Sequence, residues 1–210
     1  MPRLVTICLS LSSLWLLWSC GSAAYTHPLQ PAGRNADCLT QFKPPFKADW
    51  YNASVDVIGN HISGLLLFKA MPDSSVRVVF TSEAGLTFFD FEFRPDGTFT
   101  AKQAVNKFSN KAVINTLRKD FELILFPRTN QLLKSFTSGN EIWYALSSKN
   151  ETDYFITNHD CTSFLRAEKT GKGKKKVEMK MSGAPHLAPD SVHLQHYTFN
   201  MQISLKKLDR

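Results

Sequence analysis

The sequence has no apolar run long enough to cross a bilayer comfortably as a helix, which takes roughly twenty residues. Its only long apolar run, Leu4–Trp18, contains about fifteen residues and no charge. This run follows a single positive charge at Arg3, near the N-terminus. A short apolar run in that position is typical of a secretory signal. We therefore expect an exported protein.

The sequence also lacks the motifs of common catalytic sites. It contains no G-x-S-x-G motif, phosphate-binding loop or dinucleotide-binding fingerprint. His193 and His196 have an odd spacing in a predicted strand, so their side chains should point to opposite faces and not share a metal ion. His159 and Asp160 are typical of a turn, with no nucleophile motif nearby. We expect no enzymatic activity, no metal and no other cofactor.

Cysteine is scarce, with four in the chain, and Cys8 lies inside the apolar run. The stretch LWSC ending at Cys20 resembles the bacterial lipobox, in which Leu, a tolerant position and a small residue precede a diacylated Cys. Trp18 is an unusual occupant of the tolerant position. The competing route is cleavage by ordinary signal peptidase before Tyr25. We favour removal of residues 1–19 and acylation of Cys20, because Cys20 ends the apolar run and a polar segment follows it.

That polar segment, residues 20–45, is rich in Gly, Ala, Pro, Asn and Gln and has little apolar periodicity. Such a composition predicts a flexible tether. Acyl chains on Cys20 would gain roughly 0.8 kcal/mol per methylene buried in a membrane. The two remaining cysteines, Cys38 and Cys161, either form a disulfide, which an exported protein permits, or stay independent thiols.

Residues 46–210 have the composition of one globular domain with a substantial core. Apolar residues make up 43% of the chain and aromatic residues 12%, and the 16 Phe favour strands. Alternating segments separated by tight turns predict an antiparallel sheet. The predicted strands are Trp50–Ile58, His61–Ala70, Val76–Thr81, Leu86–Phe93, Phe99–Val105, Glu141–Ser147, Tyr154–Thr157, Ser163–Lys169, Lys175–Met181 and Val192–Leu205.

Between these two groups of strands, Lys111–Phe126 has one apolar stripe at helical spacing. We expect a helix that is capped by Ser109, stopped by Pro127 and laid across the concave side of the sheet. The strands have a period of two, which predicts their core-facing side chains. These are Ile62, Leu66, Phe68, Val76, Val78, Phe80, Phe89, Phe91 and Phe93, with Phe199, Met201, Ile203 and Leu205 near the C-terminus.

A basic segment, KTGKGKKKVEMK, occupies residues 169–180, and its two glycines suit the tip of a hairpin. The segment is either a solvated hairpin end or a contact for anionic lipid headgroups, near which each charge gains about 1 kcal/mol. The net charge of +7 agrees with both interpretations. Nucleic acid is not an expected partner outside the cytoplasm. The candidate contact residues are Lys172, Lys174, Lys175 and Lys176.

The segments SGLLLFKAMPDSSVRVVFTSEAGLTFFDFEF (63–93) and KAVINTLRKDFELIL (111–125) carry a family resemblance. With the lipobox and the tether, they resemble the lipoprotein carrier and receptor superfamily of Gram-negative envelopes, and within it outer-membrane lipoproteins of the Bacteroidota. The likeness covers the first half of the mature domain. It implies a mainly β fold with one or two helices, an incomplete antiparallel β-barrel lidded by an amphipathic helix.

The resemblance also implies a function and a location. Family members hold lipid or lipoprotein acyl chains in an apolar cavity, so we expect a monomer at the outer membrane whose partners are membrane lipids, acylated lipoproteins and other envelope proteins. The membrane-touching loop of receptor members matches Ser82–Gly85 here, but Ala84 is too small to insert. The inward residues of this chain that correspond to the cavity wall are equally compatible with a solid core, because both have the same sequence pattern. They are Leu66, Phe68, Val78, Phe89, Phe91, Leu117 and Phe121.

Two other functions remain open. The chain is alternatively a lipoprotein scaffold with a solid core, an interaction module of an envelope complex. The third hypothesis is a eukaryotic secreted lipocalin-like binder with a Cys38–Cys161 bridge and glycans at Asn52 and Asn150. Ala48 stands where a lipocalin has the glycine of its G-x-W motif, which argues against this hypothesis.

Acylation of Cys20 gives the first testable prediction. The parent protein should partition into the detergent phase, because its acyl chains prefer the micelle. The Cys20→Ala variant should be soluble or unprocessed in the same phase-separation assay. A mature parent protein that begins at Tyr25, seen by intact-mass spectrometry, would show that ordinary signal peptidase is used.

Overall fold

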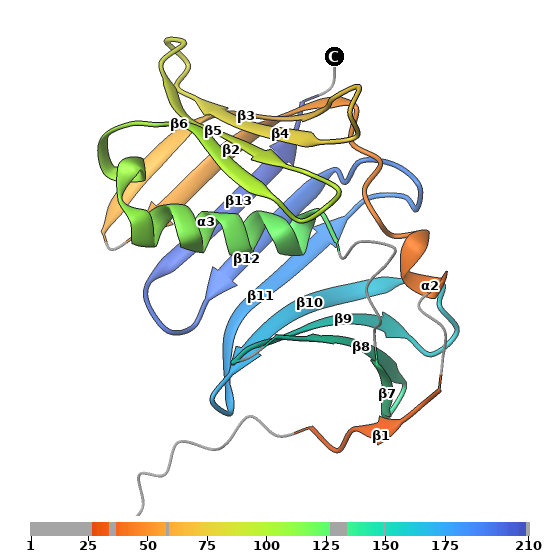
Figure 1. The fold of residues 1–210 in the computed structure, drawn as a ribbon. Helices are drawn as coiled ribbons and strands as arrows, with labels where there is room; N and C mark the ends of the chain where they lie inside the picture. The colour runs from red at the N-terminus through yellow and green to blue at the C-terminus, as the bar shows by residue number, and fades with distance from the viewer. Residues whose placement is uncertain (1–26, 34–36, 58, 127–133, 149, 209–210) are drawn as a thin grey trace, which may run out of the picture.

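A computed structural model of the protein describes residues 27–33, 37–57, 59–126, 134–148 and 150–208. These residues form one antiparallel sheet of 13 strands, in the order β1-β7-β8-β9-β10-β11-β12-β13-β2-β3-β4-β5-β6. The sheet curls without closing, so β1 and β6 are its two edges (Figure 1). The predicted mainly β, incomplete barrel is therefore confirmed. The lipocalin-like alternative is wrong in its architecture, because a lipocalin closes its barrel.

The strands form two meanders along the chain. Helix α3 (Lys111–Ile124) connects them, and α2 (Asp37–Thr40) and a 3-10 turn (Asn106–Ser109) complete the described elements. The first meander consists of β2 (Ala48–Val57), β3 (Asn60–Ala70), β4 (Val76–Thr81), β5 (Thr87–Phe93) and β6 (Phe99–Ala104). The second consists of β7 (Lys134–Ser138), β8 (Glu141–Ser147), β9 (Thr152–Asn158), β10 (Phe164–Gly171), β11 (Lys174–Ser182), β12 (Ser191–His196) and β13 (Met201–Lys207).

The two meanders join through β13 and β2, the last and first long strands. Met201 pairs with Val57, and Lys207 pairs with Tyr51. The long strand predicted over Val192–Leu205 is wrong, because the chain reverses at residues 197–200 so that β12 and β13 can pair with each other. Phe199 therefore lies in an exposed turn, whereas Met201, Ile203 and Leu205 are buried as predicted.

Helix α3 lies across the concave face of the half-sheet made by β13 and β2–β6 (Figure 1). Its N-cap is Asn110, whose side chain accepts a hydrogen bond from the Ala112 backbone N–H at 2.8 Å. The predicted cap, Ser109, is instead part of the preceding 3-10 turn. The helix ends at Ile124, and Phe126 then adopts a left-handed backbone conformation (φ 61°) that turns the chain.

The predicted core faces meet beneath this helix. Leu117 and Phe121 are each 1% exposed. The ring centroid of Phe121 lies 6.0 Å from that of Phe68, 5.8 Å from that of Phe89 and 6.4 Å from that of Phe93. Aromatic pairs at these separations add roughly 0.5–1.5 kcal/mol each beyond simple burial. The helix and its buried stripe are confirmed.

The predicted tether over residues 20–45 is wrong for the parts that the structure describes. β1 (Gln30–Pro31) pairs with β7, and Leu39 of α2 is buried. A disulfide joins Cys38 to Cys161, whose Cα atoms are 5.9 Å apart. The segment packs because it carries apolar groups and a covalent link, although its average composition is polar. The proposed signal, residues 1–19, and Cys20 lie outside the described residues.

The two edge strands differ in character. β1 has two residues, and one of them, Pro31, has no backbone N–H to offer a further strand. β6 carries Lys102, whose Nζ lies 2.8 Å from Oε2 of Glu92 on the neighbouring β5. Two register shifts interrupt the outer pairs of this end of the sheet, one between β4 and β5 and one between β5 and β6.

The packing of α3 predicts the cost of losing its central aromatic side chain. Phe121→Ala should reduce the free energy of unfolding by about 3–5 kcal/mol, because it leaves a cavity among three other rings. Urea unfolding of the purified protein measures this loss. Asn115→Ala, on the exposed side of the same helix, is the matched control and should change stability by less than about 0.5 kcal/mol. Equal stability of the two variants would show that the helix is not packed in this way.

Candidate functional site

The residues predicted to line a lipid cavity form a solid core instead. Each residue is between 0 and 2% exposed, so none of them borders a space that water can enter. The Phe89 and Phe91 rings stack with centroids 4.4 Å apart, and the Phe68 ring stacks on that of Phe46 at 4.2 Å. The corrected residues are Leu66, Phe68, Val78, Phe89, Phe91, Leu117 and Phe121. The cavity prediction fails because a core and a cavity wall have the same alternating pattern.

A cleft lies nearby, where the C-terminal half of α3 meets the two halves of the sheet. Its volume is about 610 Å³, within the range of roughly 300–1,000 Å³ that is usual for small-ligand sites. The apolar part of its wall comes from α3, the strands and the segment before β2. This part includes Phe46, Val76, Phe93, Leu125, Phe126, Leu146 and Phe155. The sequence did not predict this wall as a unit, because its residues come from separate turns and strand ends.

Charged groups surround the apolar wall of the cleft. Arg118 and Glu122, one helical turn apart on α3, form an ion pair of 2.8 Å. Arg94, in the turn between β5 and β6, pairs with Glu92 at 2.6 Å, and Lys43 adds a third positive charge. The cleft is therefore amphipathic, with three basic side chains beside an apolar floor.

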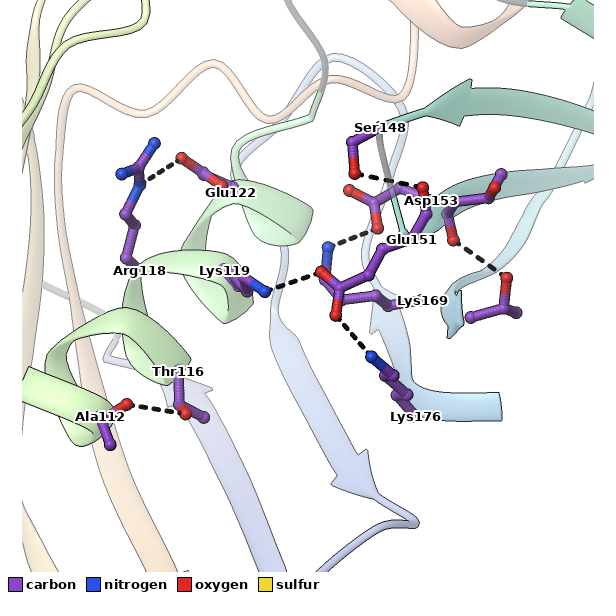
Figure 2. A network of polar contacts seen from close by, with 12 residues as sticks. Ala112, Thr116, Arg118, Lys119, Glu122, Ser148, Glu151, Asp153, Lys169 and Lys176 are labelled. Atoms are coloured by element: carbon purple, nitrogen blue, oxygen red, sulfur yellow. Dashed lines mark hydrogen bonds and ion pairs between the residues drawn. The ribbon is translucent and has the colours of Figure 1, made fainter. Parts of the chain in front are cut away.

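The lining of the cleft also includes Asp153, which forms an ion pair with Lys169 (Figure 2). Burial raises the pKa of Asp153, while the Lys169 ammonium opposes the rise. Lys169 itself is 5% exposed, so it is removed from the solvent-facing basic cluster that the sequence suggested. A buried charge of this kind persists because its partner compensates the lost hydration.

A second set of ion pairs attaches α3 to the sheet (Figure 2). The Lys119 Nζ donates to Oε2 of Glu151, and the Lys176 Nζ donates to Oε1 of the same carboxylate, each at 2.7 Å. Partial burial would raise the pKa of Glu151, but the hydrogen bonds from the two lysines outweigh it and lower the pKa to about 2. Glu151 lies in the turn between β8 and β9 and thus connects Lys119 of the helix with Lys176 of β11.

A buried polar pair lies on the inner side of the helix. Nε2 of His196, on β12, is 3.0 Å from Oδ2 of Asp120, and both side chains are almost fully buried. Burial raises the pKa of Asp120, and the hydrogen bond from His196 opposes the rise. The other Asp120 oxygen, Oδ1, has no hydrogen-bond partner among the described residues. Sequence reasoning missed the pair, although Asp120 is three residues after Leu117 and interrupts the apolar stripe.

The lysines of the basic segment, residues 169–180, differ in their exposure and in their ion pairs. Lys175 lies 2.5 Å from a carboxylate oxygen of Glu178, and Lys176 pairs with Glu151. Lys172 and Lys174 are exposed at the hairpin turn, and neither forms an ion pair with another residue that the structure describes. His193 and His196 point to opposite faces, one exposed and one buried, as predicted.

Within the described ranges, no helix is both long and apolar enough to span a membrane. No protein-family model matches the sequence, and no curated protein matches it either.

Two solved structures are similar in overall arrangement. One is a DUF1329 family protein from Desulfovibrio piger, with a TM-score of 0.45, 10% identity, and coverage of 82% of this chain and 88% of the other. The other is a LolA superfamily protein from Nitrosomonas europaea, with a TM-score of 0.46, 11% identity, and coverage of 82% and 89%. Because both scores are below 0.5, the function is inferred from this chain's own residues.

The Glu151 bridge predicts a pH dependence of stability. The folded pKa of Glu151 is about 2, below its ordinary value of 4.5. Its contribution to the free energy of unfolding is therefore fully present above about pH 4.5 and is lost as the pH falls toward about 2. Glu151→Gln should lower the unfolding free energy at neutral pH by about 1 kcal/mol after allowance for solvent screening. The difference between parent and variant should disappear in acid.

Urea unfolding from pH 7 to pH 2 measures this difference. The control is Glu83→Gln, in the exposed turn between β4 and β5, which should leave the parent's pH profile unchanged. A parent-to-Glu151→Gln difference that stays constant down to pH 2 would show that the two lysines do not hold this carboxylate in its charged form.

Proposed function

We propose that this protein is a lipid-anchored protein of the bacterial cell envelope that binds an acyl chain in the cleft beside α3. The amphipathic cleft is the observation that supports the proposal most directly. Its floor is formed by aromatic and aliphatic side chains, and its rim contains Lys43, Arg94 and Arg118. Anchoring through Cys20 and location at the outer membrane belong to the same proposal and have their own test in the Cys20→Ala variant.

The chemistry of the cleft favours an anionic amphiphile. An acyl chain placed on the floor would bury apolar surface at roughly 25 cal/mol per Å². A carboxylate or phosphate headgroup would meet the guanidinium groups at the rim, where charge-assisted hydrogen bonds are stronger than neutral ones. Binding would require the Arg118 or Arg94 guanidinium to donate hydrogen bonds to the ligand as well as to its present acidic partner. The three basic residues of the lining outnumber its two acidic ones, Glu122 and Asp153, which favours an anionic ligand over a cationic one.

A second function, an envelope scaffold without a lipid ligand, is favoured by a different observation. The space enclosed by α3 and the first meander contains buried aromatic rings in contact with one another, as expected of a solid interior. In that case the cleft would be a surface irregularity of a rigid interaction module. The two functions differ in whether the purified protein binds a lipid saturably.

A titration of delipidated protein with a fluorescent fatty acid tests the proposal. The parent should bind saturably, with one fatty acid per chain, because the cleft has room for a single acyl chain. Leu146→Trp, which places a larger side chain on the wall of the cleft, should weaken binding by at least about tenfold. Excess fatty acid should raise the melting temperature of the parent by mass action and have a smaller effect on the variant.

The matched control is Leu67→Trp, a half-buried leucine of β3 that does not line the cleft. This variant should bind like the parent, and circular dichroism should show that all three proteins are folded. Absence of saturable binding by the folded parent, or equal binding by the Leu146→Trp variant, would exclude the cleft as the lipid site. The scaffold function would then be preferred.

A further inference from the structure

Two turns lie next to each other at one end of the sheet. The first joins β10 to β11 at Lys172 and Gly173, and the second joins β12 to β13 at residues 197–200. The backbone N–H of Tyr197 donates to the Lys176 carbonyl at 2.9 Å. The Lys175 ammonium lies 4.9 Å from the centroid of the Tyr197 ring. These contacts hold the two turns together as one surface, which we call the paired-turn surface and which consists of Lys172, Lys174, Tyr197 and Phe199.

The paired-turn surface exposes two large aromatic side chains. Tyr197 is 53% exposed and Phe199 is 39% exposed, although most other aromatic side chains of the domain are buried. The Phe199 ring packs against that of His196, with centroids 4.7 Å apart, so its position beside the turn is held by a buried side chain. Rings of this kind, apolar with a polar tip in Tyr, are enriched where proteins meet the interface of a lipid bilayer.

The same surface has a net positive charge. Lys172 and Lys174 are exposed and unpaired within the described part of the chain, whereas the neighbouring Lys175, Lys176 and Lys180 each have an acidic partner. Lys172 has a left-handed backbone conformation, as does Gly173 after it, so a tight two-residue turn projects the basic side chains beyond the sheet. Lysines placed beside a surface rich in anionic lipids are attracted to it within a Debye length.

The start of the described chain connects to this surface through a series of contacts. The His27 ring lies 4.4 Å from that of Trp143, and the Arg166 guanidinium lies 5.3 Å from the Trp143 ring. Arg166 pairs with Glu168 at 2.6 Å, and Lys175, which covers Tyr197, is 3.7 Å from the same carboxylate. His27 is therefore on the face of the sheet that carries Lys175.

Chain length limits how far His27 can be from a membrane anchor. Cys20 precedes His27 by seven residues, and an extended chain of that length spans at most about 25 Å. If Cys20 is acylated, as proposed above, the bilayer surface lies within that distance of His27. The connection is short because β1 and α2 belong to the folded domain. Residues 27–33 and 37–45 therefore do not lengthen the link between Cys20 and the sheet.

We propose that the paired-turn surface docks onto an anionic lipid bilayer, with Lys172 and Lys174 at the headgroups and Tyr197 and Phe199 in the interfacial layer. The basic and aromatic side chains supply the two complementary contacts that an amphipathic membrane surface requires. The anchor then sets the distance, and the paired turns set the orientation in which the domain faces the membrane. The docking surface is separate from the lipid cleft, so either proposal can fail without the other.

Co-sedimentation with lipid vesicles tests the docking surface without the anchor. All proteins carry Cys20→Ala, so that no acyl chain contributes and the N-terminal apolar run is common to every variant. The vesicles contain either equal parts of phosphatidylglycerol and phosphatidylcholine or phosphatidylcholine alone. The parent should bind the anionic vesicles at least tenfold more tightly than the neutral ones at low salt, and the preference should decrease as salt is added.

Two double variants should each lose this binding. Lys172→Glu with Lys174→Glu should reduce it at least tenfold, and Tyr197→Ser with Phe199→Ser should reduce it several-fold. The first matched control is Lys69→Glu with Lys206→Glu, which changes the net charge equally at the opposite end of the sheet, where Lys69 pairs with Ala48 and Lys206 with Asn52. The second control is Leu187→Ser, in another exposed loop. Both controls should bind like the parent, and all variants should keep the parent's melting temperature.

Three results would overturn the proposal. Equal binding of the parent to anionic and neutral vesicles would exclude recognition of an anionic surface. An equal loss in the Lys69→Glu and Lys206→Glu control would assign binding to net charge rather than to the paired turns. Self-association of the parent without vesicles, abolished by Tyr197→Ser with Phe199→Ser, would assign the surface to a second copy of the chain.

Discussion

An open antiparallel sheet cannot bury its own concave face, so the rest of the fold depends on what covers that face. Here the cover is α3, and the contact of Phe121 with three rings from β3 and β5 is the centre of the arrangement. The aromatic and aliphatic side chains beneath α3 are buried in one apolar cluster. This dense packing explains why the candidate ligand site lies where the helix ends, and not beneath its middle. There, Leu125 and Phe126 leave the helical path and the two halves of the sheet diverge.

Charge also contributes to this arrangement, because α3 is held by polar contacts as well as by aromatic ones. Glu151 links the exposed side of the helix to β11, and Asp120 meets His196 on the inner side. A buried ionisable pair rarely adds stability compared with apolar groups of equal size, but it penalises alternative registers strongly. The helix is therefore held by Asp120 on its inner side and by Glu151 on its exposed side, while Leu117, Phe121, Leu123 and Ile124 supply its apolar burial.

Local patterns in the sequence predicted the strands of the first meander, the helix and the inward faces, because periods of two and 3.6 residues report directly which side is buried. They did not predict contacts between distant segments. The pair of Asp120 with His196 joins residues 76 positions apart, and the segment that contains Leu39 is linked to Cys161 by the Cys38 disulfide. The turn at residues 197–200 forms where the chain reverses so that β13 pairs with both β12 and the distant β2. Whether Phe89 and Phe91 line a cavity or fill a core also depends on distant side chains. Acylation of Cys20 stays a prediction.

The two unpaired edges of the sheet have a consequence for the behaviour of the protein in concentrated solution. A long, flat edge offers a row of free backbone groups and recruits further strands, which leads to aggregation. The β1 edge is too short for this and contains Pro31, which has no N–H to donate. The β6 edge is longer, but the register shifts beside it twist the strand, and Lys102 places a charge along it. An incoming strand would have to bury that charge, so the sheet can remain open without growing into a fibril.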